Sequence, residues 1–195
     1  MAATESTMLE LGTAAPDFAL PTPAGDIVRL SDFAGSQGLV VAFICNHCPF
    51  VQLIREGLAA YAREYAGRGI EMVAINSNDF ANYAGDTPEK MQEEIDQFGY
   101  SFPYVYDESQ EIAKAYRAAC TPEFYLFDAN HELVYRGRFD AATPGNGVAV
   151  TGEELRAATD ALLAGSAPDA DQRPGIGCNI KWKPGNAPDL SLIHI

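Results

Sequence analysis

Two cysteines lie three residues apart in the stretch ICNHCPFV, residues 44–51. Such a pair can be a reactive dithiol, a metal clamp or a pair of inert core thiols. A continuous apolar run, LVVAFI at residues 39–44, precedes the pair and predicts a buried strand. Apolar residues at three- and four-residue steps follow from Pro49 and predict an amphipathic helix. The pair therefore lies between a strand and the N-terminus of a helix.

This position favours thiolate chemistry. Unpaired backbone N–H groups and the positive end of a helix dipole stabilise a negative charge and lower the pKa of a thiol. We expect Cys45 to be the exposed attacking thiolate and Cys48, one turn further, to resolve the mixed disulfide. His47 adds a hydrogen-bond donor or a positive charge, which predicts a reduction potential shifted toward the oxidising side.

The sequence gives less support to the other roles that cysteines can have, zinc binding and haem attachment. Four cysteines and His47 could in principle build a zinc site, but the second pair, Cys120 and Cys178, lacks the close spacing of zinc ribbons. Covalent haem attachment requires a histidine after the second cysteine, where this chain has Pro49. We therefore expect no metal and no organic cofactor.

The elements around the pair predict an α/β domain with a central mixed β-sheet flanked by helices. Residues 17–33 indicate an N-terminal hairpin around the turn at residues 23–26. An apolar strand at residues 71–76 follows the first helix, which makes a parallel βαβ unit. Thr87 is a predicted N-cap with Pro88 at the first helical position of the next helix.

The second half of the chain predicts an antiparallel hairpin from strands at residues 124–127 and 133–135. Ser109 is expected to cap a short helix, and Thr151 with Glu154 to form a capping box for a final helix. These elements predict one domain over residues 10–165. A tail rich in Pro, Gly and Asp follows at residues 166–195, and its last six residues, LSLIHI at 190–195, change character so abruptly that we predict them to be non-native.

Charge and hydropathy limit the partners. Asp and Glu total 27 against 13 for Lys and Arg, a net charge of −14, which repels phosphate backbones and anionic membrane surfaces. No segment approaches membrane-spanning length, and the N-terminus lacks the features of a signal peptide. We expect a cytoplasmic protein that binds neither nucleic acid nor membrane.

The order of these motifs resembles the thioredoxin-like superfamily, in its redoxin or AhpC/TSA-like branch. The resemblance rests on APDF at residues 15–18, CNHCP at 45–49 and the later Thr121-Pro122. More narrowly, the tail motif GCNIKW at residues 177–182 is similar to that of peroxiredoxin-like thioredoxin-fold proteins with a CxxC motif. The resemblance implies a thioredoxin-like fold in which a cis-proline, here Pro122, lies against the dithiol and helps to hold the partner's backbone.

The chain departs from true peroxiredoxins at three positions. It has Val41 in place of the proline before the peroxidatic cysteine, Cys45 in place of the hydroxyl residue and Thr121 in place of the arginine. We therefore predict a thiol–disulfide oxidoreductase that exchanges its Cys45/Cys48 dithiol with a partner disulfide. Two alternatives stay open: an antioxidant thiol peroxidase that uses Cys48, with Cys45 or Cys178 resolving, and a non-catalytic binding or metal-holding module.

Two further cysteines are candidate accessory residues. Cys120 directly precedes Thr121-Pro122, so the thioredoxin-like fold that the resemblance implies would place it near the dithiol. The simpler interpretation of Cys120 is a small buried side chain. Cys178 either forms a resolving disulfide with Cys48 or Cys120, or packs beside Trp182. The expected partners are a protein or small-molecule disulfide, a hydroperoxide under the peroxidase alternative, and an upstream dithiol reductant.

Overall fold

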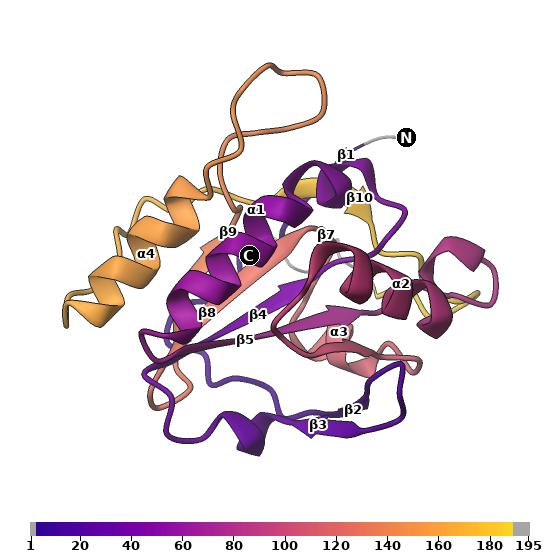
Figure 1. The fold of residues 1–195 in the computed structure, drawn as a ribbon, viewed down its shortest axis with the longest axis horizontal. Coiled ribbons are helices and arrows are strands. Elements are labelled where there is room, and N and C mark those ends of the chain that lie inside the picture. Colours follow the sequence, from indigo (N-terminus) through magenta and orange to yellow (C-terminus); the bar gives the residue numbers. More distant parts are fainter. Residues whose placement is uncertain (1–2, 189–195) are drawn as a thin grey trace.

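A five-stranded mixed sheet forms the centre of the protein, whose computed structural model describes residues 3–188 (Figure 1). The strands, in spatial order, are β6 (Tyr104–Tyr106), β5 (Ile70–Asn76), β4 (Gly38–Phe43), β8 (Glu123–Asp128) and β9 (Leu133–Gly137). Strands β4, β5 and β6 run parallel, whereas β8 and β9 are antiparallel to their neighbours. The predicted α/β class and the mixed sheet are confirmed.

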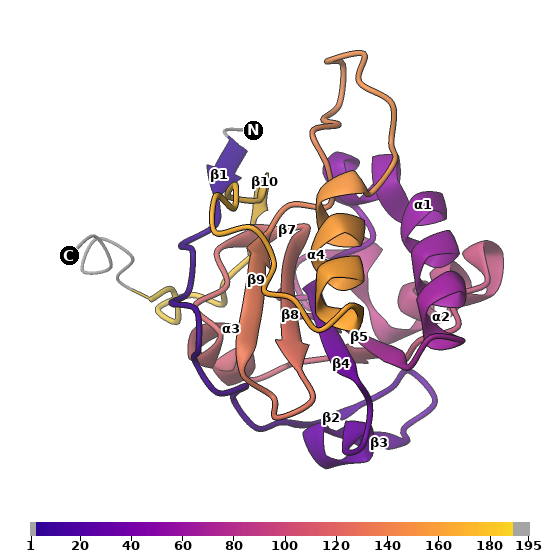
Figure 2. The ribbon, with the colours of Figure 1, turned by 90° about the vertical axis from the view of Figure 1, so that its left-hand side faces the viewer.

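Helices cover both faces of this sheet (Figure 2). The helices are α1 (Pro49–Ala66), α2 (Pro88–Phe98), α3 (Glu111–Ala115) and α4 (Glu153–Leu163), with single 3₁₀ turns at Leu30–Phe33 and Ala84–Asp86. Helices α1, α2 and α4 pack on one face, and α3 packs on the other together with the hairpin of β2 (Ala19–Pro21) and β3 (Ile27–Arg29). The predicted N-terminal hairpin is therefore confirmed.

The central strand β4 explains why its sequence is apolar throughout. Its residues alternate between two hydrophobic cores, with Val40 and Ala42 toward α1, and Leu39, Val41 and Phe43 toward α3 and the hairpin. All six residues of the strand are buried. Because β4 is covered on both faces, the chain first reaches the surface region beyond its carboxyl end. The segment that follows the strand therefore lies at that end of the sheet.

Helix α1 begins where the sequence predicts. Cys48 is its N-cap and Pro49 its first residue, where the missing proline N–H removes no hydrogen bond. The helix buries the stripe of apolar residues that predicted it, including Ile54, Leu58 and Tyr61. The N-terminus of α1 is thereby fixed directly beyond the end of β4.

The predicted caps of the later helices were less accurate. Thr87 does cap α2, and its hydroxyl accepts a hydrogen bond from the Lys90 amide at 3.4 Å. The capping box of Thr151 and Glu154 is wrong, because Gly152, in a left-handed conformation, is the N-cap of α4. The carboxylate of Asp140 accepts the amides of Thr151 and Gly152 instead, and Glu154 forms an ion pair with a neighbouring arginine.

Helix α3 shows the same shift by one residue. Gln110, at a φ of 65°, is its N-cap rather than the predicted Ser109. The Ser109 hydroxyl still accepts a hydrogen bond from the Glu111 amide, at 3.2 Å.

The tail returns to the domain and forms a second small sheet. Strand β10 (Ile176–Asn179) lies between β1 (Ala3–Glu5) and β7 (Cys120–Thr121) and is antiparallel to both. Strand β1, at the start of the described chain, therefore lies side by side with β10 of the tail, which pairs with β7 in the segment that precedes β8 (Figure 2). The predicted non-native segment, residues 190–195, lies outside the described residues.

Within residues 3–188, no helix combines the length and the apolar character that crossing a bilayer requires.

Candidate functional site

The two cysteines of the CxxC motif lie at the junction of β4 and α1. Cys45 follows the end of β4 by two residues, and Cys48 is the N-cap of α1. Both are buried, with 1% of Cys45 and 0% of Cys48 exposed, and all four cysteines of the chain are free thiols. The structure therefore differs from the expectation of an exposed Cys45, because the β7 segment and the returning tail pack over the pair.

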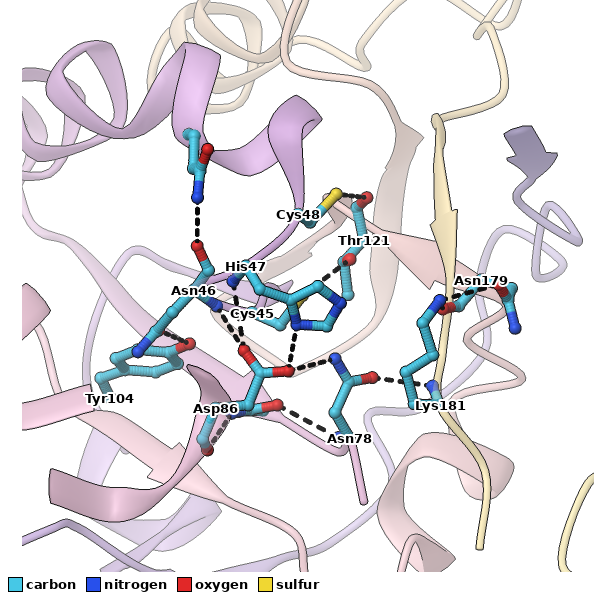
Figure 3. A network of polar contacts seen from close by, with 12 residues as sticks. Cys45, Asn46, His47, Cys48, Asn78, Asp86, Tyr104, Thr121, Asn179 and Lys181 are labelled. Atoms are coloured by element: carbon cyan, nitrogen blue, oxygen red, sulfur yellow. Dashed lines mark hydrogen bonds and ion pairs between the residues drawn. The ribbon is translucent and has the colours of Figure 1, made fainter. Parts of the chain in front are cut away.

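Thr121 touches both sulfurs (Figure 3). Its hydroxyl lies 3.3 Å from Cys45 Sγ, and its carbonyl accepts a hydrogen bond from the Cys48 thiol at 3.1 Å. The peptide bond from Thr121 to Pro122 is cis. The structure thus brings together four residues that the sequence singled out, Cys45, Cys48, Thr121 and Pro122.

The two thiols differ in acidity. A hydrogen bond from the Cys45 thiol lowers the pKa of Cys48 to about 5, against the opposing effect of burial, and the Cys178 thiol and the Val51 amide lower it further. The same hydrogen bond, together with burial and the negative charge of Asp86, raises the pKa of Cys45. The Thr121 hydroxyl also lowers the pKa of Cys48. The reduced pair therefore shares one proton, and the charge resides on Cys48.

His47 lies beside the pair and is held by a buried carboxylate. Its Nδ1 is 2.5 Å from Oδ2 of Asp86, and its ring stacks on Tyr83 with the planes 11° apart. The hydrogen bond to Asp86 raises the pKa of His47 despite partial burial. A protonated His47 and the Cys48 thiolate stabilise each other electrostatically.

Asp86 is the functional residue that sequence reasoning missed. It is 0% exposed, and its carboxylate accepts four hydrogen bonds at 2.5–3.2 Å. The donors are the amides of Asn46 and His47, His47 Nδ1 and Asn78 Nδ2. Burial works to raise the pKa of Asp86, but the hydrogen bonds from His47 and Asn78 and the charge of His47 hold it below its usual range.

Nothing local in the sequence indicates this role. Asp86 lies 39 residues from His47 and directly before the N-cap Thr87, where an acidic residue has an ordinary interpretation. The contact exists because the 3₁₀ turn at Ala84–Asp86 folds back from the end of β5 onto the cysteine loop (Figure 3).

A metal ion fits this site poorly. Within the described residues, Cys45, His47 and Asp86 form a group whose ligand atoms lie within 4.8 Å of one another. A metal requires free lone pairs, yet both oxygens of Asp86 already accept two hydrogen bonds each, and one of these comes from His47 Nδ1. The Asp86 carboxylate instead holds the cysteine loop through its hydrogen bonds to Asn46 and His47.

The two accessory cysteines have different surroundings. Cys120 is buried beside Glu123, at 3.8 Å from its Oε2, and burial and that carboxylate raise the pKa of Cys120. Cys178 lies opposite Thr121 in the register of β10 with β7 and packs in the same buried cluster as Cys45 and Cys48. Of these two candidates, Cys178 is thus the one in contact with the dithiol.

The fold and the site together define a thioredoxin-like protein, in which a CxxC pair at a helix N-terminus lies against a cis-proline. The chain belongs to the AhpC/TSA family, whose model matches residues 11–136.

The chain is also similar to a named relative and to solved structures. The thiol-disulfide oxidoreductase ResA of Geobacillus kaustophilus (strain HTA426) is 28% identical over 130 residues, which cover 67% of this chain and 70% of that protein. The solved structure of a hypothetical protein from Sinorhizobium meliloti 1021 is 53% identical with a TM-score of 0.92, covering 93% of this chain and 100% of that one. An uncharacterized conserved protein from Geobacillus kaustophilus is 52% identical with a TM-score of 0.93, covering 95% and 98% of the two chains.

The ionisation of the dithiol is a first testable property. Titration of the thiolate absorbance at 240 nm should show one thiol ionising near pH 5, because hydrogen bonds from Cys45 and three further groups lower the pKa of Cys48. Cys48→Ser should remove this step. Cys45→Ala should move it to higher pH because it deletes the main donor, whereas Cys120→Ser should leave it in place. A wild-type protein whose first thiolate forms only near the ordinary value of 9.0 would contradict the assignment.

The His47–Asp86 pair should make stability depend on pH. The folded pKa of Asp86 lies below 3.8 and that of His47 above 6.5, so the pair stabilises fully between about pH 4 and pH 6.5. Its contribution is lost as pH falls through the folded pKa of Asp86 or rises through that of His47. Asp86→Asn should therefore lower the free energy of unfolding by about 3 kcal/mol near pH 5.5 and by less at pH 9.

Chemical denaturation at both pH values measures this difference, and NMR titration should show the pKa of His47 falling in the variant. Asp26→Asn, at an exposed turn, is the matched control and should change neither quantity. An equal loss of stability at the two pH values would mean that the charge of the pair contributes nothing.

Proposed function

We propose that the protein is a thiol–disulfide oxidoreductase that exchanges electrons between its Cys45/Cys48 dithiol and a partner disulfide. The observation that carries the proposal is a pair of free thiols, Cys45 and Cys48, at the N-terminus of α1, both in contact with Thr121 directly before the cis-proline. A thiolate is the species that attacks a disulfide, and a neighbouring thiol completes the exchange. The similarity to a protein named thiol-disulfide oxidoreductase supports the same activity.

The exchange proceeds in two balanced steps. The Cys48 thiolate attacks one sulfur of the partner disulfide, a mixed disulfide forms, and the other partner sulfur leaves as a thiolate. Cys45 then gives up its proton and attacks Cys48 Sγ, which forms the Cys45–Cys48 disulfide and releases the second partner thiolate. Two electrons pass to the partner. The sequence suggested the opposite order of attack, but the hydrogen bond to Cys48, burial and the charge of Asp86 raise the pKa of Cys45.

His47 and Asp86 act as positioning residues in this scheme. Asp86 fixes the backbone of the cysteine loop and the orientation of the imidazole. A positive His47 stabilises the thiolate, and a stabilised reduced form makes a dithiol more oxidising. Pro122 shapes the surface on which the partner's backbone would lie. The partner is a protein or small-molecule disulfide, and the cytoplasmic location stays a prediction.

A thiol peroxidase is the second candidate, because an acidic Cys48 is also suited to attack a hydroperoxide. The surroundings favour it less. Among the groups of the described chain that chiefly set the pKa of Cys48, none is an arginine. Arg138, which lines a small hollow with Pro122, is already paired with Glu154 at 2.6 Å.

Turnover of a model substrate tests the proposed activity. The wild-type protein should accelerate reduction of insulin disulfides by glutathione, and Cys48→Ser should return the rate to the uncatalysed value because the attacking sulfur is gone. Cys120→Ser, whose thiol faces Glu123, should retain the activity. A wild-type protein that leaves insulin disulfides untouched but consumes a hydroperoxide would support the peroxidase instead.

A further inference from the structure

The tail strand β10 lies directly on the loop that carries Thr121 and the cis-proline. Cys178 is the register partner of Thr121, and Asn179 that of Cys120. Gly177 allows this approach, because a Cβ at that position would overlap the carbonyl oxygen of Thr121. The same carbonyl oxygen lies 3.1 Å from Cys48 Sγ and accepts a hydrogen bond from the Cys48 thiol. The backbone of the tail at Gly177 therefore packs directly against the backbone at Thr121, and any side chain at position 177 would prevent this contact.

This packing brings a third sulfur to the pair. Cys178 is 4% exposed and belongs to the same buried cluster as Cys45 and Cys48. It lowers the pKa of Cys48, after the larger effect of Cys45, whereas the sulfur of the fourth cysteine, Cys120, lies 3.8 Å from Glu123 Oε2. Cys48 thus lies between two thiols, one from its own motif and one from the tail.

Several contacts hold the tail in this place. Strand β1 pairs with the outer edge of β10, with Ala3 opposite Cys178. Beyond the strand, the Lys181 amide donates to Asn78 Oδ1 at 2.8 Å, and the Lys181 carbonyl accepts the Asp79 amide at 2.8 Å. Because Asn78 also donates to Asp86, one hydrogen-bonded chain joins the tail to the cysteine loop (Figure 3).

Strand β10 lies where a disulfide substrate of the Cys45/Cys48 pair would have to bind. A disulfide substrate must present a sulfur to Cys48, and Cys178 already places one in the same buried cluster. The backbone of β10 pairs with β7 immediately before Pro122, the residue proposed above to shape the partner surface. The tail therefore occupies the space next to the dithiol in the way that a bound substrate strand would.

We propose that Cys178 is a third redox-active thiol and that β10 acts as an internal exchange partner of the dithiol. This inference rests on the proposed function. In the oxidised protein the Cys178 thiolate attacks Cys48 Sγ of the Cys45–Cys48 disulfide. A Cys48–Cys178 bond forms, the Cys45–Cys48 bond breaks, and the Cys45 sulfur leaves as a thiolate that takes the proton given up by Cys178. No electrons enter or leave the protein.

The electrostatics make this step follow oxidation. In the reduced protein, burial and then the charged Cys48 raise the pKa of Cys178 to about 12, while Lys181 lowers it. Formation of the Cys45–Cys48 disulfide removes the charge on Cys48, so one cause of the raised pKa disappears and the positive Lys181 remains. Cys178 thus becomes easier to ionise when a disulfide is available for it to attack.

Peptide mapping of the full chain tests the relay without relying on activity. The Cys45→Ser protein, oxidised with glutathione disulfide, quenched in acid and alkylated, should contain Cys48 linked to Cys178 in most molecules. The relay predicts that glutathione first couples to Cys48 and that Cys178 then displaces it. Cys45→Ser/Cys178→Ser should stop at the glutathione adduct, and Cys45→Ser/Cys120→Ser should still form the link. Circular dichroism confirms that each variant is folded.

The possible failures are distinguishable. If Cys45→Ser keeps glutathione on Cys48 with Cys178 free, or links Cys48 to Cys120, the relay is wrong. In that case a Cys45–Cys48 disulfide in the oxidised wild-type protein leaves the proposed function intact. If the oxidised Cys178→Ser protein, in which the relay cannot occur, forms no Cys45–Cys48 disulfide, the proposed function itself fails.

Discussion

A single buried carboxylate, that of Asp86, organises the site. A charge that is removed from water costs several kcal/mol unless it is paired and hydrogen-bonded, and Asp86 has no exposed surface. Four donors offset this cost, and three of them belong to Asn46 and His47 in the cysteine loop. The conformation in which the loop between β4 and α1 satisfies Asp86 is also the one that places both cysteines. The geometry of the dithiol is therefore a consequence of keeping this carboxylate charged inside the protein.

The same network explains why the dithiol and the tail form one unit. Asn78 donates to Asp86 with its amide group and accepts the Lys181 amide with its carbonyl, so the cysteine loop, the segment after β5 and the tail share hydrogen bonds. Movement of the tail would break a contact of Asn78 and uncover Cys48. In the described arrangement both cysteines are buried, and β10 lies beside them in antiparallel register with β7.

The sequence predicted the features that depend on local patterns. The apolar run of β4, the amphipathic stripe of α1 and the Thr87-Pro88 start of α2 each occur where expected. The family resemblance supplied the cis-proline, which no local pattern specifies. Features that depend on distant contacts were missed. Asp86 acquires its role only by contact with a histidine 39 residues away, and the need for glycine at position 177 arises from the carbonyl of Thr121.

The caps show how a tertiary contact overrides a local motif. Thr151 and Glu154 have the spacing of a capping box, but Asp140 holds the amides of Thr151 and Gly152, and the helix begins after Gly152 in a left-handed conformation. The exposure of Cys45 failed for a related reason. The strand and the helix that flank the pair do not by themselves cover Cys45. The segment that covers the pair is β10, residues 176–179, which lies more than 120 positions further along the chain.

The most direct measurement of the central claim is the redox equilibrium of the wild-type protein in a series of glutathione buffers, with thiols trapped by alkylation and mapped by mass spectrometry. The account predicts that a Cys45–Cys48 disulfide appears as a two-electron couple, with a tenfold change in its equilibrium for about 30 mV. Its midpoint should lie above the roughly −270 mV of thioredoxin, because the thiolate is stabilised in the reduced form. Cys45 and Cys48 that remain alkylated at every potential would contradict it.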